Sequence, residues 1–299
     1  MVTVRRLAGA AVLATAVAAP VAAQRSTDLS RIVGVQGNPT RVMTVGLEDR
    51  EASEPVLVLQ SGAGSAMSTW ARLIPLISPI APLVAYERPG VGSSAFDGVD
   101  PTPLHVSQHL HALLDVMEIE PPYILVGHSR GGTLILYYAG RYPEEVVGMV
   151  YLDPPDPTLT REEFLMTSDP DELATRQAEL DGLSANGPQV SAARRAEARV
   201  AREFMDSPVE ARGIPEDPIV PTAFVVATGF QQLGVSFMDE RYQTAMNELR
   251  VGRFRRRIEG LPASTLQVVT DGGHFVHRYA SELVAESIRR VVEAVRAGR

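Results

Sequence analysis

The chain has 299 residues, of which 45% are hydrophobic and 21% are charged, and its formal net charge is −8. These values indicate one globular domain with a sizeable core, and the acidic balance argues against nucleic acid as a partner. The chain contains 28 arginines and no lysine. The absence of lysine excludes a Schiff-base lysine and a P-loop lysine. Cysteine is absent, so no disulfide contributes to the fold.

Residues 1–23 are predicted to be a secretory signal peptide. Two arginines at positions 5 and 6 precede a run of small apolar residues, and residues 21–23 form a small-residue cleavage site. Pro20 and the many alanines favour cleavage over a permanent anchor. We therefore expect a mature domain of residues 24–299, periplasmic or secreted, without a stable membrane anchor. Loss of two arginines would leave 26 against 36 acidic residues, a net charge of −10.

Short apolar runs alternate with helical stretches along the rest of the chain. Runs of this kind are typical of buried parallel strands, and their alternation with helices predicts an α/β fold. The runs are Pro55–Leu59, Leu83–Ala85, Tyr123–Val126, Val146–Leu152, Thr222–Ala227 and Thr265–Val269.

The first two runs are followed by turns with different predicted roles. Gln60–Gly64 is a loop of small residues, which would let a backbone N–H approach a reacting oxygen. Together with the serine described below, this loop predicts the N–H of Ala63 as an oxyanion donor, the alternative being a plain glycine-rich turn. In the second turn, Tyr86–Ser94, we expect Glu87 and Arg88 to form a local ion pair that supports the scaffold.

His105, His109 and His111 lie close together in a helical stretch, and the first two are spaced to share a helix face. No thiol accompanies them, and no nearby glutamate pattern matches a hydrolytic zinc site. We expect exposed helix histidines and no metal ion here.

The strongest motif is Gly127-His128-Ser129-Arg130-Gly131. It follows the strand Tyr123–Val126 directly, and a helix is predicted to begin with Thr133–Tyr138. A G-x-S-x-G motif between strand and helix is typical of a nucleophile elbow, in which glycines leave room for a strained turn. Ser129 is therefore predicted to be a nucleophile, and the N–H of Arg130, at the helix start, to be the second oxyanion donor. His128 is expected to pack beneath the elbow.

A second catalytic candidate lies near the C-terminus. Asp271-Gly272-Gly273-His274-Phe275 follows the strand Thr265–Val269 and precedes an amphipathic helix. A histidine on a glycine-rich loop can reach over the serine, take its hydroxyl proton and return it to the leaving group. His274 is therefore predicted to be the general base and acid, with His277 beside or behind the site.

With these four segments in register, the chain resembles the α/β-hydrolase superfamily from about Arg41 to Val295. It is most similar to lidded, single-domain esterase-like members whose elbow has the form G-H-S-x-G. The resemblance implies an eight-stranded, mostly parallel sheet with helices on both faces, a Ser-His-acid triad and no cofactor. A helical lid fits the long segment at about residues 155–221. Its predicted apolar ceiling is Phe164, Leu165, Met166, Phe204 and Met205.

The acid of the triad departs from the usual pattern of the family. The usual position follows the strand Thr222–Ala227, where Gln231 and Gln232 stand in place of a carboxylate. Some relatives carry the acid one strand earlier, and Asp153 occupies that position here. Asp153 is therefore the predicted acid, although an Asx turn before Pro154 is an alternative role.

Three other aspartates are candidates for the acid, and one cluster of arginines lies near the C-terminus. Asp239 is the next candidate for the acid, followed by Asp156 and Asp271. The arginines at positions 250, 253, 255, 256 and 257 form the one basic cluster, which we expect to be a solvated helix face.

The residues together predict a serine hydrolase that cleaves carboxylic esters, or the related acyl bonds of amides and lactones, in small molecules through an acyl-enzyme. A serine at the elbow argues against haloalkane and ester-forming epoxide chemistry, which need a carboxylate nucleophile. The alternatives are an acyltransferase or carbon–carbon bond hydrolase on the same scaffold, or a non-catalytic ligand-binding protein. The oligomeric state is left open.

Overall fold

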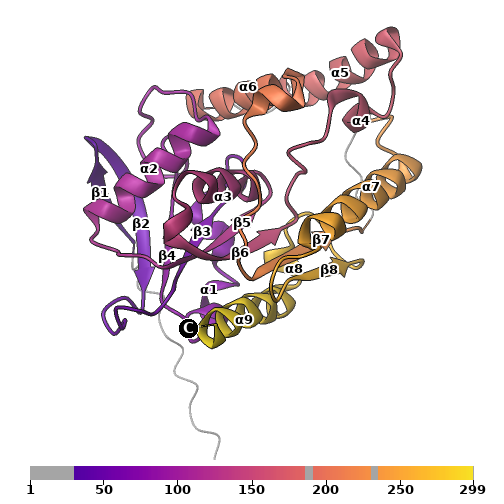
Figure 1. Cartoon of the computed structure of the whole chain (residues 1–299). Coiled ribbons are helices and arrows are strands. Elements are labelled where there is room, and N and C mark those ends of the chain that lie inside the picture. The colour runs from indigo at the N-terminus through magenta and orange to yellow at the C-terminus, as the bar shows by residue number, and fades with distance from the viewer. Residues whose placement is uncertain (1–29, 186–190, 230–234, 299) are drawn as a thin grey trace, which may run out of the picture.

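The computed structural model describes residues 30–185, 191–229 and 235–298. The predicted signal peptide (1–23) and the glutamines at positions 231 and 232 lie outside the described residues. Within them, an eight-stranded sheet has the order β1-β2-β4-β3-β5-β6-β7-β8 and forms the centre of the molecule (Figure 1). The strands are β1 (Ser30–Val35), β2 (Asn38–Val45), β3 (Val56–Gln60), β4 (Leu83–Tyr86), β5 (Tyr123–His128), β6 (Val146–Leu152), β7 (Thr222–Ala227) and β8 (Thr265–Val269).

The sheet is mostly parallel, as the family resemblance implies. β2 pairs antiparallel with both β1 and β4, and every neighbouring pair from β4 to β8 is parallel. Every residue of β3, β4, β5 and β7 is buried. Unbroken burial is expected where helices cover both faces of a parallel sheet, and it explains why these strands are continuous apolar runs.

Helices cover both faces of the sheet, and each face has its own hydrophobic core. One face carries α2 (Pro103–Val116), α3 (Arg130–Arg141) and α7 (Glu240–Ile258), and the other carries α1 (Ile74–Ile77), α8 (Val276–Tyr279) and α9 (Ser281–Ala297). Short 3-10 turns lie at Met67–Trp70 (η1) and Pro143–Glu145 (η2).

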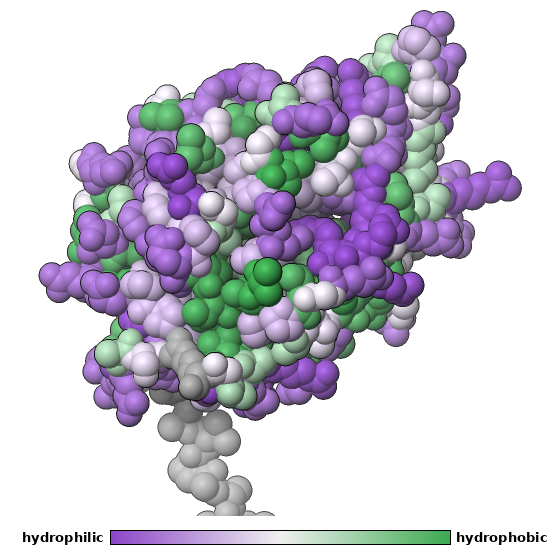
Figure 2. Space-filling view, viewed as in Figure 1, coloured by the Kyte–Doolittle hydropathy of each residue, from purple (hydrophilic) through white to green (hydrophobic). Residues whose placement is uncertain are grey.

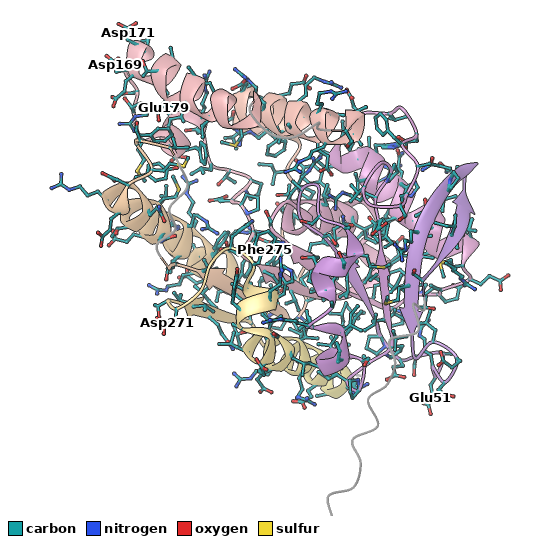
Figure 3. All side chains as sticks on the ribbon, turned by 180° about the vertical axis from the view of Figure 1, so that it is seen from behind. Glu51, Asp169, Asp171, Glu179, Asp271 and Phe275 are labelled. Atoms are coloured by element: carbon teal, nitrogen blue, oxygen red, sulfur yellow. The ribbon has the colours of Figure 1, made fainter. Side chains whose placement is uncertain are left out.

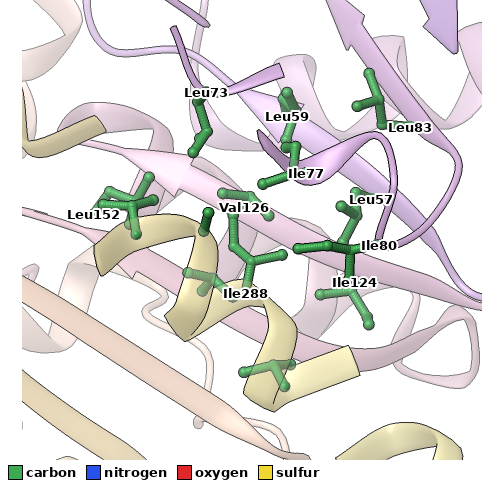
Figure 4. Packing of buried hydrophobic residues seen from close by; sticks show 14 of the residues in the cluster. Leu57, Leu59, Leu73, Ile77, Ile80, Leu83, Ile124, Val126, Leu152 and Ile288 are labelled. Atoms are coloured by element: carbon green, nitrogen blue, oxygen red, sulfur yellow. The ribbon is translucent and has the colours of Figure 1, made fainter. Parts of the chain in front are cut away.

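Helix α9 shows how the apolar pattern directs this packing. Val284, Ile288, Val291 and Val295 recur at intervals of three and four residues and are buried, which places them on one helix face. Figure 4 shows Ile288 packed near Val126 of β5, with Ile77 of α1 close by.

The segment between β6 and β7, where the sequence predicts a helical insertion, contains α4 (Arg161–Leu165), α5 (Pro170–Ala185), α6 (Ala192–Asp206) and η3 (Val209–Arg212). In Figure 1, α6 and α5 run across one end of the molecule, beyond α2 and α3. The acidic residues labelled in Figure 3 at the outer end of α5 show how far the insertion reaches.

The visible surface is mainly hydrophilic, with hydrophobic residues in separate groups (Figure 2). In the part of the chain that the structure describes, no helix is both long enough and apolar enough to cross a bilayer.

Two glycines in helices offer a matched test of packing. A Cβ on Gly131, in α3, would lie 2.1 Å from the Gln60 carbonyl oxygen, whereas a Cβ on Gly252, in α7, would meet only the end of the Arg256 side chain, at 3.8 Å. We expect Gly131→Ala to lower the free energy of unfolding by about 3 kcal/mol or more, because β3 and α3 must separate. We expect Gly252→Ala to raise it by about 0.5–1 kcal/mol, because alanine favours the helix.

Urea unfolding with both variants measures this difference. Equal midpoints for the two variants would contradict the close approach of α3 to β3.

Candidate active site

Ser129 lies on the tight turn between β5 and α3. Its φ of 52° and ψ of −129° are unusual for a residue with a side chain, and its N–H donates to the Leu152 carbonyl of β6 at 2.9 Å. A Cβ on Gly127 would lie 2.5 Å from the Gly131 carbonyl oxygen. The turn therefore has no room for side chains at either glycine, which is the steric requirement of a nucleophile elbow.

Asp153 directly follows β6 and contacts His274. Its Oδ2 accepts a hydrogen bond from His274 Nδ1 at 2.6 Å. Its Oδ1 accepts from the Ala227 N–H at 3.1 Å and from the Arg250 guanidinium at 2.7 Å. The carboxylate is thus held by three donors from three separate segments, and only 5% of its side chain is exposed.

The electrostatics of Asp153 favour its ionised form. Burial raises the pKa of this carboxyl, but the hydrogen bond from His274 and the charge of Arg250 outweigh burial, so the pKa lies below its ordinary value. An ionised carboxylate can only accept, so Nδ1 of His274 carries the proton. The other ring nitrogen, Nε2, is then free to take a proton.

The other candidate acids have different partners. Asp239 caps α7 by accepting from the Tyr242 N–H at 2.9 Å, and Asp156 pairs with Arg253 at 3.1 Å. Asp271 is exposed at the periphery, as Figure 3 shows. Among the described residues, none of these three is hydrogen-bonded to His274.

The expectation of a solvated basic face on α7 is wrong for three of its five arginines. Arg250 binds Asp153, Arg253 binds Asp156 and Glu163, and Arg257 binds Asp217. Their spacing of three and four residues places them on one side of the helix, and that side faces the acidic segments after β6 and before β7. The spacing could have shown that these three differ from exposed Arg255 and Arg256.

His128, His274 and His277 lie close together, with His128 between the other two. The His128 ring centroid is 4.7 Å from that of His274 and 4.4 Å from that of His277. Burial lowers the pKa of His128 to about 4 and that of His277 to about 2, so both rings stay neutral near pH 7. His128 Nε2 lies 2.9 Å from the His274 carbonyl oxygen and must donate to it. His128 therefore supports the backbone of His274 from beneath.

The predicted oxyanion donors lie in the two segments beside Ser129. Arg130 is the first residue of α3, so its N–H has no acceptor within the helix. In the loop after β3, Gly62 comes close to Ser129, since a Cβ on it would lie 3.2 Å from the Ser129 Cβ. Ala63, the residue predicted to donate, follows Gly62 and is exposed.

A cavity of about 690 Å³ contains the three predicted triad residues. The Ser129 hydroxyl makes no hydrogen bond to His274 among the described residues, and such bonds often form only when substrate is bound. Most of the wall is apolar and comes from the insertion, from α7 and from the segment before it. The apolar wall includes Pro154, Leu159, Phe164, Met205, Met238, Tyr242, Met246 and Phe275.

Phe164 and Met205 were predicted for the ceiling of this cavity, and both line it. Phe204 does not; its ring lies against Tyr137 and the Arg212 guanidinium instead. Leu165 is buried and Met166 packs in the small core around Tyr242. The five residues therefore divide between roofing the cavity and fastening the insertion.

Two expectations about ionisable residues outside the predicted triad are wrong. Glu87 and Arg88 do not pair with each other, because Arg88 pairs with Glu197 of α6 at 2.7 Å. His109 is buried rather than exposed, and its Nε2 lies 3.1 Å from the Thr40 hydroxyl. Within the described ranges, no group of three or more histidines and carboxylates could hold a metal ion.

Comparison with known proteins gives the family. The model of the alpha/beta hydrolase fold family matches residues 54–211. YqjL of Bacillus subtilis is 31% identical over 108 residues, which are 36% of this chain and 43% of YqjL. A haloalkane dehalogenase of Mycolicibacterium smegmatis is 30% identical over 128 residues, which are 42% of this chain and 40% of that protein. The chain spans less than half the length of these curated relatives.

A solved structure agrees over a longer stretch. The structure of DBJA (the delta mutant) superposes with a TM-score of 0.66 and covers 90% of this chain and 99% of its own. Because the identity is 15%, this likeness concerns the fold alone.

The contact between Asp153 and His274 can be tested by substitution. Asp153→Asn should lower kcat for an activated ester by about 10⁴-fold, because an amide favours the wrong tautomer and cannot stabilise an imidazolium ion. Asp239→Asn is the matched control and should change kcat by less than about 3-fold, since asparagine caps a helix as well as aspartate does.

Circular dichroism would verify that both variants fold. A crippled Asp239→Asn beside an active Asp153→Asn would place the acid after β7 instead.

Proposed function

Since the chain belongs to the α/β-hydrolase fold family, we propose that it is a serine hydrolase that cleaves carboxylic esters through an acyl-enzyme. The observation that carries this proposal is the 2.6 Å hydrogen bond between Asp153 and His274, in the same cavity as a serine on a strained elbow. A nucleophile, a base and a group that orients the base are the three parts that such chemistry needs.

The proposed reaction begins with attack of Ser129 Oγ on the ester carbonyl. The C–O bond forms as Nε2 of His274 takes the hydroxyl proton, and the carbonyl electron pair moves onto the oxygen. Backbone N–H groups of Arg130 and of the loop after β3, at Ala63 or neighbouring Gly62, would stabilise this oxyanion. The carbonyl then re-forms as the ester C–O bond breaks, and the imidazolium protonates the departing alkoxide to give the alcohol. Water attacks the acyl-enzyme as His274 takes one of its protons; the bond to Ser129 Oγ then breaks, His274 returns the proton to Oγ, and the acid leaves.

The nucleophile favours esters over haloalkanes. One relative is named a haloalkane dehalogenase, but that chemistry requires a carboxylate that displaces halide and becomes an ester. Ser129 occupies the elbow here, so an acyl-enzyme is the covalent intermediate that this side chain can form and water can resolve.

The cavity favours an apolar acyl group. Its volume is about 690 Å³ and its wall is mainly Leu, Met, Phe and Tyr side chains, which would bind a hydrocarbon chain by excluding water from it. We propose esters of small to medium-sized organic acids as the substrate class.

The nucleophile is tested by Ser129→Ala. The variant should lose hydrolysis of p-nitrophenyl esters and labelling by a fluorophosphonate probe, while its thermal midpoint stays close to that of the parent protein. Product analysis with and without an added alcohol would separate hydrolysis from acyl transfer. A variant that keeps most of the activity would exclude a serine hydrolase.

The acyl preference is tested by Met246→Ala, because Met246 of α7 is buried and lines the cavity. The larger cavity should shift the best p-nitrophenyl ester to a longer acyl chain, while the free energy of unfolding falls by about 2–5 kcal/mol. The control is Thr244→Ala, an exposed position of the same helix, which should change neither. An unchanged chain-length profile in a folded Met246→Ala variant would place the acyl group elsewhere.

A further inference from the structure

A carboxylate from the insertion is buried against the loop that follows β3. Glu197, in the first half of α6, is 4% exposed, and its Oε2 accepts a hydrogen bond from the Gly64 N–H at 2.6 Å. The two residues lie 133 positions apart. Gly64 ends the same small-residue loop in which an oxyanion donor is proposed.

Arg88 completes the hold on this loop. Its Nε and Nη2 donate to Glu197 Oε1 at 3.0 and 2.7 Å. Its Nη1 donates to the Ser61 carbonyl at 2.6 Å, and Nη2 also donates to the Gly62 carbonyl at 2.8 Å. Arg88 is 2% exposed, so the pair binds three of the loop's backbone groups in a site away from water.

The same glutamate also reaches the elbow. Arg130, the residue after the nucleophile, donates from Nη1 to the Glu197 carbonyl oxygen at 3.2 Å, and Nη1 lies 3.8 Å from Glu197 Oε1. The second terminal nitrogen of Arg130 donates to the Pro101 carbonyl. Glu197 therefore contacts both segments whose N–H groups are proposed to face the oxyanion.

The first residues of α6 pack closely against the turns after β3 and β4, and this packing keeps the contacts of Glu197 in place. A Cβ on Gly90, in the turn after β4, would lie 2.2 Å from the Ala193 Cβ, and a Cβ on Gly64 would lie 3.4 Å from Arg194 Nε. Both contacts are made by the first residues of α6. This part of the insertion thus packs directly on the turns that surround the nucleophile, while Met205, near the other end of α6, lines the cavity.

Glu197 supplies the negative charge that the guanidinium groups of Arg88 and Arg130 share. Burial raises the pKa of its carboxyl, but the charges of Arg88 and Arg130 and the hydrogen bonds from Arg88 and Gly64 lower the pKa below its ordinary value. A neutral replacement would leave the buried guanidinium of Arg88 and the partly buried guanidinium of Arg130 without their shared partner, which is costly for groups held away from water.

We propose that Glu197 is a positioning residue for the oxyanion hole, through which the insertion holds the loop after β3 against the elbow. This inference rests on the proposed serine hydrolase function. Preorganised donors lower the barrier only if they point to where charge develops, so a small displacement of Gly62–Gly64 should slow the chemical step more than it weakens substrate binding.

The test compares Glu197→Gln with Glu203→Gln. Glu203 lies on the same helix, and its side chain is 64% exposed. Removal of one oxyanion donor costs about 10²–10³-fold in kcat, so displacement of the loop should cost about 10-fold or more. We expect this loss in kcat for Glu197→Gln, with KM changed by less than about 3-fold, and no change for Glu203→Gln.

The affinity of a transition-state analogue separates a positioning role of Glu197 from a purely structural one, because a purely structural role would leave this affinity unchanged. An alkyl trifluoromethyl ketone forms an anionic adduct with the serine, so its affinity for Glu197→Gln should fall by the same factor as kcat/KM. If Glu197 only fastens α6, the variant will have a lower thermal midpoint but will keep the parent kcat and inhibitor affinity, which would overturn the proposal.

Two further outcomes, a Glu197→Gln variant that does not fold and a parent protein without esterase activity, can be told apart from failure of the inference itself. If Glu197→Gln does not fold, Glu197→Asp replaces it, because this variant keeps the charge and shortens the reach to Gly64; parent values of kcat and inhibitor affinity would again overturn the proposal. If the parent protein neither hydrolyses esters nor reacts with the fluorophosphonate probe, the proposed function fails and the inference falls with it. An active parent with an unaffected Glu197→Gln variant overturns the inference alone.

Discussion

The hydrogen bond between Asp153 and His274 joins segments 121 positions apart, and much of the site's architecture serves it. Asp153 is held at the end of β6 by the Ala227 N–H of β7 and by Arg250 of α7. His274 is supported from beneath by buried His128, which donates to its carbonyl. As the proposed general base, His274 keeps the correct tautomer only while both of its neighbours stay fixed, so the packing of β6, β7 and α7 would be part of the catalytic site.

Arginine makes several of the long-range polar contacts among the described residues. Asp153 with Arg250, Glu197 with Arg88 and Asp156 with Arg253 are pairs in which the carboxylate is buried. A guanidinium presents several donors in a rigid plane, so one side chain can bind a carboxylate and backbone carbonyls together, as Arg88 does. Each pair joins a loop at the end of a strand to a helix of the insertion or to α7. The insertion is therefore fixed to the catalytic face by charge as well as by apolar packing.

The insertion serves two purposes in this arrangement. Phe164 of α4 and Met205 of α6 supply part of the apolar wall of the cavity, while Glu197 of α6 contacts the loop after β3 and Arg130, the residue after Ser129. Helix α6 thus contributes both to the surface that would receive an acyl chain, through Met205, and to the contacts that would orient the oxyanion donors, through Glu197. A change in the insertion would consequently be felt both in substrate preference and in the rate of the chemical step.

The apolar runs predicted six of the eight strands, and the mostly parallel sheet implied by the resemblance is present. Ser129 and His274 could be selected from sequence because their signals are local: a strand, a glycine-rich turn and a helix follow one another within a few residues. Asp153 was harder to select, because the sequence offers four aspartates as candidates and residue type does not distinguish them. Only the folded chain shows which of them contacts His274. The pairing of Arg88 with Glu197 and of Arg250 with Asp153, and the burial of His109, could not be read from the sequence. Contacts across 109 or 97 positions depend on how α6 and α7 pack over the sheet, and periodicity along the chain contains no information on that packing.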